Sequence, residues 1–142
     1  MLDLKQMRAI GMMVARQAQE KAKQPDVAAN EIIDMAPLLK EWKQGKHEAG
    51  EVVVYNGYPY KCVQSHDSTY DASWNPEDAP ALFAPYHATD KAHALPYVRP
   101  TGAHDAYKRG EWMLWDGKAY ECQQDGTIYD PTVLPSAWRQ AE

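Results

Sequence analysis

The feature that most constrains the fold of this chain is an internal repeat beyond its first 40 residues. When Gly50 is aligned with Gly110, the residues that follow agree at many positions in one register. The matched pairs are Gly50/Gly110, Glu51/Glu111, Tyr55/Trp115, Asn56/Asp116, Gly57/Gly117, Tyr60/Tyr120, Cys62/Cys122 and Gln64/Gln124. With a shorter shift the match resumes, Tyr70-Asp71 on Tyr129-Asp130 and Pro80–Phe83 on Pro135–Trp138. Duplication of one small unit explains this agreement.

Each repeated unit has the pattern of a β-hairpin. In the first unit Val53 and Tyr55 face the same side of one strand, and Tyr60 begins the same alternation on a returning strand. Asn56-Gly57 lies between the strands, as Asp116-Gly117 does in the second unit, and both pairs readily adopt the positive φ angles of a tight hairpin turn. The pattern predicts two small, antiparallel, three-stranded β-modules.

The N-terminal residues carry helical signals instead. Asp3 can cap a helix with Gln6 three residues later, as in a capping box. Pro25-Asp26 interrupts the helical pattern and can begin a second helix that ends before Pro37. A narrow apolar stripe at helical spacing comprises Leu4, Met7, Gly11, Val14 and Ala18. The expected fold class is α+β, with a helical segment at 1–36, a first β-module at 37–86, a linker at 87–97 and a second β-module at 98–142.

The net charge, the lack of long apolar runs and the two cysteines limit which partners and which cellular compartment we expect. The net charge of −5 disfavours nucleic acid as a partner, because proteins that bind it present basic surfaces. Neither a membrane-spanning run nor a signal peptide is recognisable, so we expect no membrane partner and synthesis in the cytoplasm without signal-dependent export. The two cysteines, Cys62 and Cys122, occupy equivalent inward positions of the two units and are expected to be separate buried thiols.

Aromatic residues are unusual here in kind and in place. Five Trp and nine Tyr accompany a single Phe, and all of them lie at or beyond Trp42. Trp and Tyr combine an apolar ring with a polar group, which suits half-exposed binding surfaces. Those that alternate inward along the strands are expected in the core, namely Tyr55, Tyr60, Trp115 and Tyr120. Candidates for stacking against a sugar ring are Tyr58, Tyr70, Trp74 and Tyr129, although small modules also use aromatics simply to pack.

One stretch of the first unit is specific enough to compare with known families. From Gly50 to His66 it reads Gly-Glu-x-Val-x-Tyr-Asn-Gly-x-x-Tyr-Lys-Cys-x-Gln-x-His. This pattern resembles the small chitin-binding-type modules of carbohydrate-binding families 5 and 12. Such modules open with Trp, here Trp42, and close with Pro-x-x-Trp. In this chain the closing motif is Pro80–Phe83, with Phe83 in the place of the Trp. The resemblance implies a small β-fold and a polysaccharide as partner.

The second unit, in which Pro100–Tyr107 leads into Gly110, is similar to a variant of this module in bacteriophage and prophage tail proteins. Those proteins also tend to carry a short helical N-terminus before paired modules. The resemblance implies a place in the virion tail, other phage tail proteins as partners, and a role in host attachment. Because phages reuse such modules as structural parts, an assembly or adaptor protein with no sugar ligand is the alternative. A detached binding region of a chitinase-like enzyme is a third possibility, disfavoured by the missing signal peptide and catalytic domain.

The outward face of both hairpins is apolar, whereas a free antiparallel hairpin would be polar there. This indicates that the other unit, the helices or a neighbouring subunit covers it, and a bound ligand is the less favoured alternative. The helical stripe has the width of a coiled-coil seam, which favours a homo-oligomer; by analogy with tail symmetry we expect a trimer. The predicted interface comprises Leu4, Met7, Val14, Val52, Val54, Trp112 and Leu114. Alternatively, the helix docks on another tail protein or folds back over its own strands.

The sequence contains no recognisable catalytic motif. Glu51 and Glu111 stand where the family has a structural acid, and not where glycoside hydrolysis would need a carboxylate pair. His87, Asp90 and His93 are spaced so that they could in principle hold a metal ion, but the two histidines have no third strong ligand beside them. We therefore expect no catalytic residue, metal or cofactor. The predicted function is a non-enzymatic tail-associated protein that binds host-surface carbohydrate through aromatic platforms.

Overall fold

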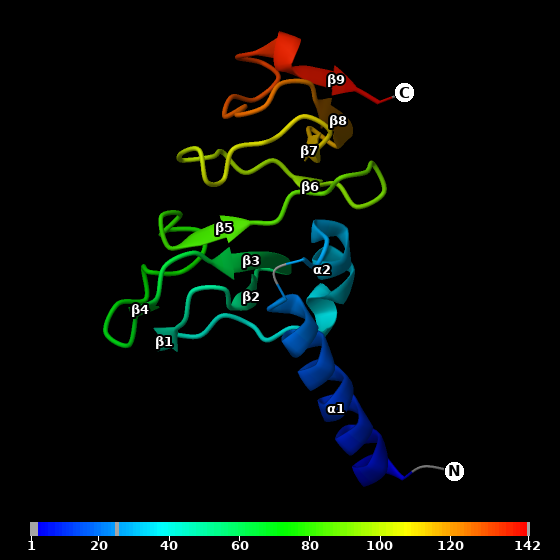
Figure 1. The fold of residues 1–142 in the computed structure, drawn as a ribbon, viewed down its shortest axis with the longest axis vertical. Coiled ribbons are helices and arrows are strands. Elements are labelled where there is room, and N and C mark those ends of the chain that lie inside the picture. Colours follow the sequence, from blue (N-terminus) through cyan, green and yellow to red (C-terminus); the bar gives the residue numbers. More distant parts are fainter. Residues whose placement is uncertain (1–2, 25, 142) are drawn as a thin grey trace.

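The computed structural model describes residues 3–24 and 26–141 and has an elongated shape (Figure 1). A helix projects from one end, and two small β-units follow one another along the long axis towards the C-terminus. The predicted α+β class is confirmed. Pro25, at the expected helix break, lies outside the described residues. Within the described ranges no helix is both long enough and apolar enough to cross a membrane.

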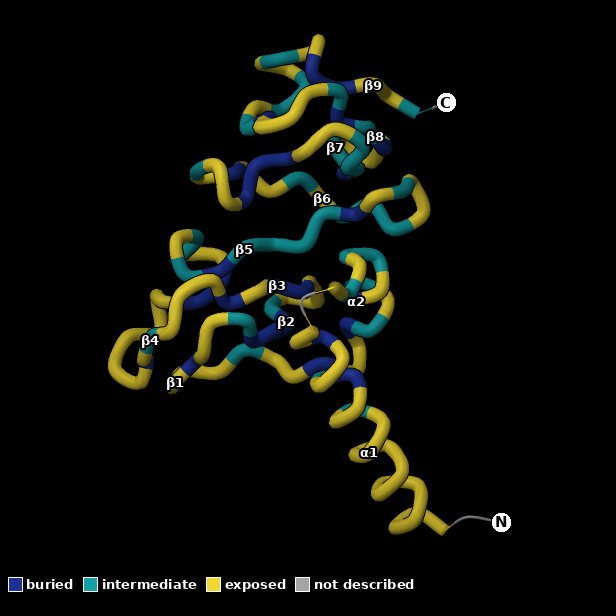
Figure 2. The backbone as a smooth tube through the Cα atoms, in the orientation of Figure 1, coloured by how far each residue is buried: buried dark blue, intermediate teal, exposed yellow. Residues whose placement is uncertain are grey.

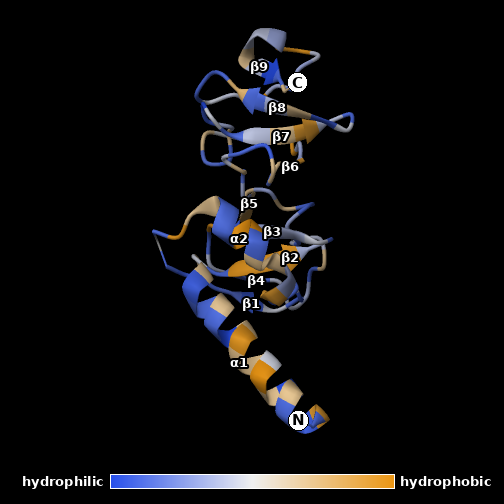
Figure 3. Cartoon of the chain, turned by 90° about the vertical axis from the view of Figure 1, so that its right-hand side faces the viewer, coloured by the Kyte–Doolittle hydropathy of each residue, from blue (hydrophilic) through white to orange (hydrophobic). Residues whose placement is uncertain are grey.

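Helix α1 (Leu4–Ala22) begins at the predicted capping box. Asp3 accepts a hydrogen bond from the backbone N–H of Gln6 at 2.8 Å, and the Gln6 side chain accepts one from the backbone N–H of Asp3 at 2.9 Å. Residues 4–14 are exposed along the projecting part of the helix (yellow in Figure 2), and they include the apolar stripe (orange in Figure 3). Within the described residues, this part of α1 has no covering element from its own chain.

The other end of α1 docks on the first β-unit. Gln19 fixes it, because its Nε2 donates to the carbonyl of Val52 at 2.9 Å and its Oε1 accepts from the backbone N–H of Lys40 at 3.2 Å. Helix α2 (Ala29–Met35) and the short 3₁₀ turn η1 (Ala36–Leu38) complete a small helical layer over the unit.

This helical layer corrects part of the predicted oligomer interface. Val52 and Val54 are 0% and 6% exposed, and they form one apolar cluster with Ala18, Ile32 and Leu39 of the helical segment. The apolar outer face of the first hairpin is thus covered by the chain itself, so these two valines are not available to a neighbouring subunit. Burying a Val side chain in this way contributes about 1.5–3 kcal/mol.

The first unit contains a three-stranded antiparallel sheet, as predicted, with order β2-β3-β5. Its strands are β2 (Val52–Tyr55), β3 (Tyr58–Cys62) and β5 (Phe83–Pro85). The hairpin turn has φ angles of 52° at Asn56 and 85° at Gly57, which confirms the expected tight turn. A separate two-stranded sheet pairs β1 (Lys46–His47) with β4 (His66–Asp67), so that His47 lies opposite His66.

The second unit differs from the prediction, because its sheet has four strands in the order β6-β7-β8-β9. These are β6 (Leu95–Pro96), β7 (Trp112–Trp115), β8 (Lys118–Cys122) and β9 (Trp138–Gln140). The additional strand, β6, comes from the segment assigned to the linker and pairs in parallel with β7, with Leu95 opposite Met113. The backbone N–H of Tyr97 donates to the carbonyl of Leu114 at 2.9 Å and extends this pairing.

Equivalent backbone hydrogen bonds occur at positions matched by the repeat. Gly50 donates to the carbonyl of Cys62 at 2.8 Å, and Gly110 donates to that of Cys122 at 2.9 Å. The backbone N–H of Cys62 in turn donates to the carbonyl of Glu51, and that of Cys122 donates to the carbonyl of Glu111, both at 2.7 Å.

The thiols of Cys62 and Cys122 are both free and buried, as predicted. Burial raises the pKa of the Cys62 thiol.

Candidate functional site

The segment between β4 and β5 places an exposed tryptophan on a loop that local hydrogen bonds hold in shape. Asp67 accepts from the backbone N–H of Thr69 at 2.9 Å, and Asp71 accepts from that of Ser73, also at 2.9 Å. The backbone N–H of Trp74 then donates to the carbonyl of Asp71 at 3.3 Å. Short polar side chains that bond their own backbone in this way stabilise turns.

Asn75, which follows the tryptophan, organises the rest of this loop. It is 5% exposed, and its Nδ2 donates to the carbonyl of Ala72 and to the carboxylate of Asp78, both at 2.9 Å. Its Oδ1 accepts from the backbone N–H groups of Glu77 and Asp78 at 3.0 and 2.9 Å. The loop is therefore preorganised on both sides of Trp74.

Two aromatic side chains, His66 and Phe83, support the indole of Trp74 from the protein side, and we call this pair its aromatic pedestal. The indole meets the imidazole of His66 edge to face, with ring centroids 6.2 Å apart, and His66 in turn meets Phe83 at 5.2 Å. Trp74 nevertheless keeps 41% of its surface exposed, whereas Phe83 is fully buried. A ring that is supported from within and exposed outside can stack against a ligand without a change in the fold.

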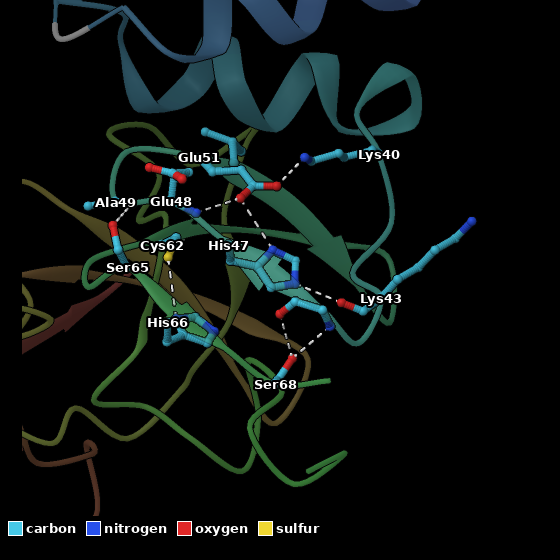
Figure 4. A network of polar contacts seen from close by, with 12 residues as sticks. Lys40, Lys43, His47, Glu48, Ala49, Glu51, Cys62, Ser65, His66 and Ser68 are labelled. Atoms are coloured by element: carbon cyan, nitrogen blue, oxygen red, sulfur yellow. Dashed lines mark hydrogen bonds and ion pairs between the residues drawn. The ribbon is translucent and has the colours of Figure 1, made fainter. Parts of the chain in front are cut away.

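A network of polar contacts supports the other side of this pedestal (Figure 4). Glu51 is 8% exposed; it contacts the ammonium of Lys40, lies 3.3 Å from Nδ1 of His47, and accepts from the backbone N–H of Glu48 at 3.0 Å. Burial raises the pKa of the Glu51 carboxyl, but the contacts with Lys40, Glu48 and His47 outweigh burial and leave the pKa below its ordinary value. The remaining nitrogen of His47 lies 2.7 Å from the carbonyl of Lys43. Glu51 is thus fully engaged in holding the fold.

The second unit repeats the loop without its tryptophan. Asp130 accepts from the backbone N–H of Thr132 at 2.8 Å, as Asp71 does from Ser73. The next residue is Trp74 in the first unit but Val133 in the second, where it is 61% exposed. Only the first unit therefore presents an indole at this position.

The structure does not bring the four predicted sugar-binding aromatics together. Tyr70 is 99% exposed on the same loop as Trp74, and Tyr129 is 43% exposed in the second unit, where its carbonyl accepts from Nε1 of Trp138 at 2.8 Å. Tyr58, at 38% exposed, lines a cleft between the two units instead. Of the aromatics assigned to the core, Tyr60 is buried. Three others are partly exposed and pack against buried apolar side chains, Tyr55 in the first unit and Trp115 and Tyr120 in the second.

The cleft between the units is a feature that the sequence did not indicate. It has a volume of about 410 Å³ and is bounded by the first hairpin and the loop before β5 on one side and by β6, its following loop and β7 on the other. Trp112, predicted at an assembly interface, is half-buried and lines it. Only the packing of one unit against the other creates this space, so no local motif could reveal it.

The histidines at 87 and 93 separate in the fold. Nδ1 of His87 lies 3.2 Å from Glu111, and its ring stacks on Tyr107 with centroids 3.8 Å apart. His93 instead contacts Asp90 and Asp34, and hydrogen bonds to these carboxylates raise its pKa. Among the residues that the structure describes, no group of three or more His, Cys, Asp or Glu side chains could hold a metal ion.

Comparison with known proteins finds a match to a known family in the first unit. Residues 41–84 match the model of carbohydrate-binding module family 5/12. This range holds Trp74, its pedestal and the hairpin, so the resemblance seen in the sequence is confirmed for the first unit. A stretch of 48 residues is 49% identical to chitinase A1 of Niallia circulans. The stretch covers 33% of this chain and 7% of that enzyme, so this chain spans only a small part of the enzyme's length.

Proposed function

We propose that this protein is a non-enzymatic carbohydrate-binding protein whose first unit holds a polysaccharide against Trp74. The observation that carries the proposal is an exposed indole on a preorganised loop, inside the segment that matches family 5/12. The C–H faces of a pyranose ring pack against a flat indole, while nearby polar groups bond its hydroxyls. The likeness to chitinase A1 makes chitin, a polymer of β-linked N-acetylglucosamine, the first ligand to test.

The second unit arose, in this proposal, by duplication of the first. The matched pairs of residues, the equivalent Gly-to-Cys hydrogen bonds and the two Asp-anchored loops support this origin. Val133 in place of Trp74 means that the second unit does not offer the same platform. Tyr70 and Tyr129 are exposed beside these positions and are proposed as accessory contacts.

The proposed location is the tail of a bacteriophage or prophage-derived particle, assembled in the host cytoplasm together with other tail proteins. The projecting helix α1 supports a role in assembly, because Leu4, Met7 and Val14 are 59%, 51% and 41% exposed along one stripe. A helical segment as short as the projecting residues 4–14 is marginal in water on its own, so a partner helix would stabilise it. We propose a homotrimer, which would also present three Trp74 side chains to one wall and raise the avidity of weak single sites.

The second candidate function is a purely structural tail or fibre adaptor that binds no sugar. The exposed stripe of α1 favours it, and so does the missing indole in the second unit. Under this alternative, the exposure of Trp74 reflects a contact with another tail protein.

Retention on an insoluble polysaccharide separates the two functions. Full-length protein is mixed with chitin beads, with purified bacterial cell walls and with cellulose at about 0.15 M salt, where exposed charge contacts are screened. The proposed function predicts retention on chitin or on cell walls beyond that on cellulose. An adaptor without a sugar ligand would stay in solution in all three cases.

A further inference from the structure

The cleft between the two units carries the chemistry of a second ligand site. We infer that it binds a single, soluble segment of the same polysaccharide, separately from Trp74. This inference rests on the proposed function, since the class of ligand is the same. Trp74 does not line the cleft, so the two sites can be tested independently.

Both walls of the cleft supply aromatic rings. Tyr58 and Tyr86 come from the first unit, and Tyr97 and Trp112 come from the second. Tyr86, Tyr97 and Trp112 are half-buried, which leaves ring surface towards the cleft while each ring is held in place. Tyr97 is fixed further, because its hydroxyl donates to the carbonyl of Ile128 at 2.6 Å. Rings on opposite walls can sandwich a sugar, whereas a lone exposed ring can stack on one face only.

Charged and amide groups also reach the cleft from both units. Glu77 and Asn56 belong to the first unit, where Nδ2 of Asn56 donates to the Glu77 carboxylate at 3.3 Å. Arg99 lines the cleft from the second unit and is exposed. A carboxylate accepts hydrogen bonds from sugar hydroxyls and a guanidinium donates to them, so the cleft offers both halves of the pairing that a sugar needs.

The wall between these rings contains one polar atom that no described residue satisfies. His87 has a side chain only 8% exposed, and its Nδ1 faces the Glu111 carboxylate at 3.2 Å. Nε2 of the same ring is buried and has no hydrogen-bond partner among the described residues. Buried polar groups without partners are rare in folded proteins, so this nitrogen stands out in the wall of the cleft. A sugar hydroxyl, which can both donate and accept, is a group that can pair with it in either state of the ring.

The shape of the cleft decides which form of the ligand it takes. Its volume of about 410 Å³ lies in the range of about 300–1,000 Å³ typical of small-molecule sites. A chain packed in an insoluble surface cannot enter a space closed on two sides, whereas a free oligosaccharide can. Trp74 is exposed on a loop, so it can contact a polysaccharide chain that lies in an insoluble surface.

Titration calorimetry with a soluble probe, tetra-N-acetylchitotetraose, tests this inference on the full-length protein. The double variant Glu77→Ala/Arg99→Ala removes one acceptor and one donor from the cleft without a change in net charge. A matched control is Glu48→Ala/Arg109→Ala, since both residues are exposed and lie outside the cleft. We expect the Kd to rise about tenfold or more in the cleft variant and to stay within about twofold in the control. Thermal unfolding verifies that each variant is folded.

Trp74→Ala separates a failure of this inference from a failure of the proposed function. We expect this variant to lose retention on chitin beads but to keep the Kd for the soluble probe within about threefold. If wild type is retained on chitin but does not bind the probe, or binds it equally well in the cleft variant, the cleft inference is overturned and the proposed function stands. If wild type binds neither chitin beads, nor cell walls, nor the soluble probe, both fail.

Discussion

The imidazole of His66 supports the indole of Trp74 edge to face, at 6.2 Å between centroids and 65° between ring planes. His66 itself lies 5.4 Å from His47, whose Nδ1 contacts the buried Glu51. The exposed ring is thereby connected to the polar network at the edge of the first sheet. The loop needs no apolar cover over Trp74, and the residue keeps 41% of its surface exposed.

The buried carboxylate of Glu51 should make stability depend on pH. Its pKa is lowered in the folded protein, so its ionised form stabilises the fold above the ordinary value of 4.5. This contribution is lost as the pH falls below 4.5 and through the lowered folded pKa. At pH 7 we expect Glu51→Gln to lower the free energy of unfolding by about 1–3 kcal/mol, because it replaces a charged acceptor for three partners.

Urea unfolding at pH 7 and pH 3 measures this contribution. The difference between wild type and Glu51→Gln should shrink at the lower pH, and the exposed control Glu48→Gln should stay within about 0.5 kcal/mol of wild type at pH 7. An equal difference at both pH values would mean that the ionised form of Glu51 contributes nothing to stability.

The stripe of α1 should hold an oligomer together. We expect full-length protein at tens of micromolar to be a trimer by light scattering. The double variant Met7→Glu/Val14→Glu should dissociate it, because it places like charges in the seam. Met12→Glu is the matched control, since Met12 is 68% exposed and lies outside the stripe. A monomeric full-length protein would end the oligomer proposal, and an oligomer that survives the double variant would place the interface elsewhere.

The loop of the second unit should accept the missing indole. Val133 is 61% exposed, so Val133→Trp should leave the free energy of unfolding within about 0.5 kcal/mol of wild type. If the two loops share an origin and a shape, the new ring should increase retention on chitin by roughly threefold to tenfold. Unchanged retention by this folded variant would argue that the second unit lacks the neighbours that a platform needs.

The sequence predicted the hairpins because their signals are local. Asn56-Gly57 and Asp116-Gly117 have the φ angles that two-residue turns require, and the internal repeat places the two pairs at matched positions. Trp74 was a candidate because it lies between the hairpin and the closing turn of its unit, and in the structure it is 41% exposed.

Features that depend on distant contacts were not predictable in the same way. The parallel strand β6 exists because two residues of a polar linker pair with Met113 and Leu114, and no periodicity marks so short a strand. The apolar pattern at Val52 and Val54 showed that a cover was needed but not which cover, and Gln19 reveals that α1 docks there. The cleft between the units likewise follows from how the units pack together.

Retention of Trp74→Ala on insoluble chitin tests the central claim most directly. Wild type, Trp74→Ala and the position-matched control Val133→Ala are compared on chitin beads, and urea unfolding of each is recorded. We predict that Trp74→Ala binds about tenfold or more weakly, while its free energy of unfolding falls by no more than about 2 kcal/mol, well below the roughly 3–5 kcal/mol of a buried Trp. Val133→Ala should match wild type. A folded Trp74→Ala variant that is retained as well as wild type would contradict the account.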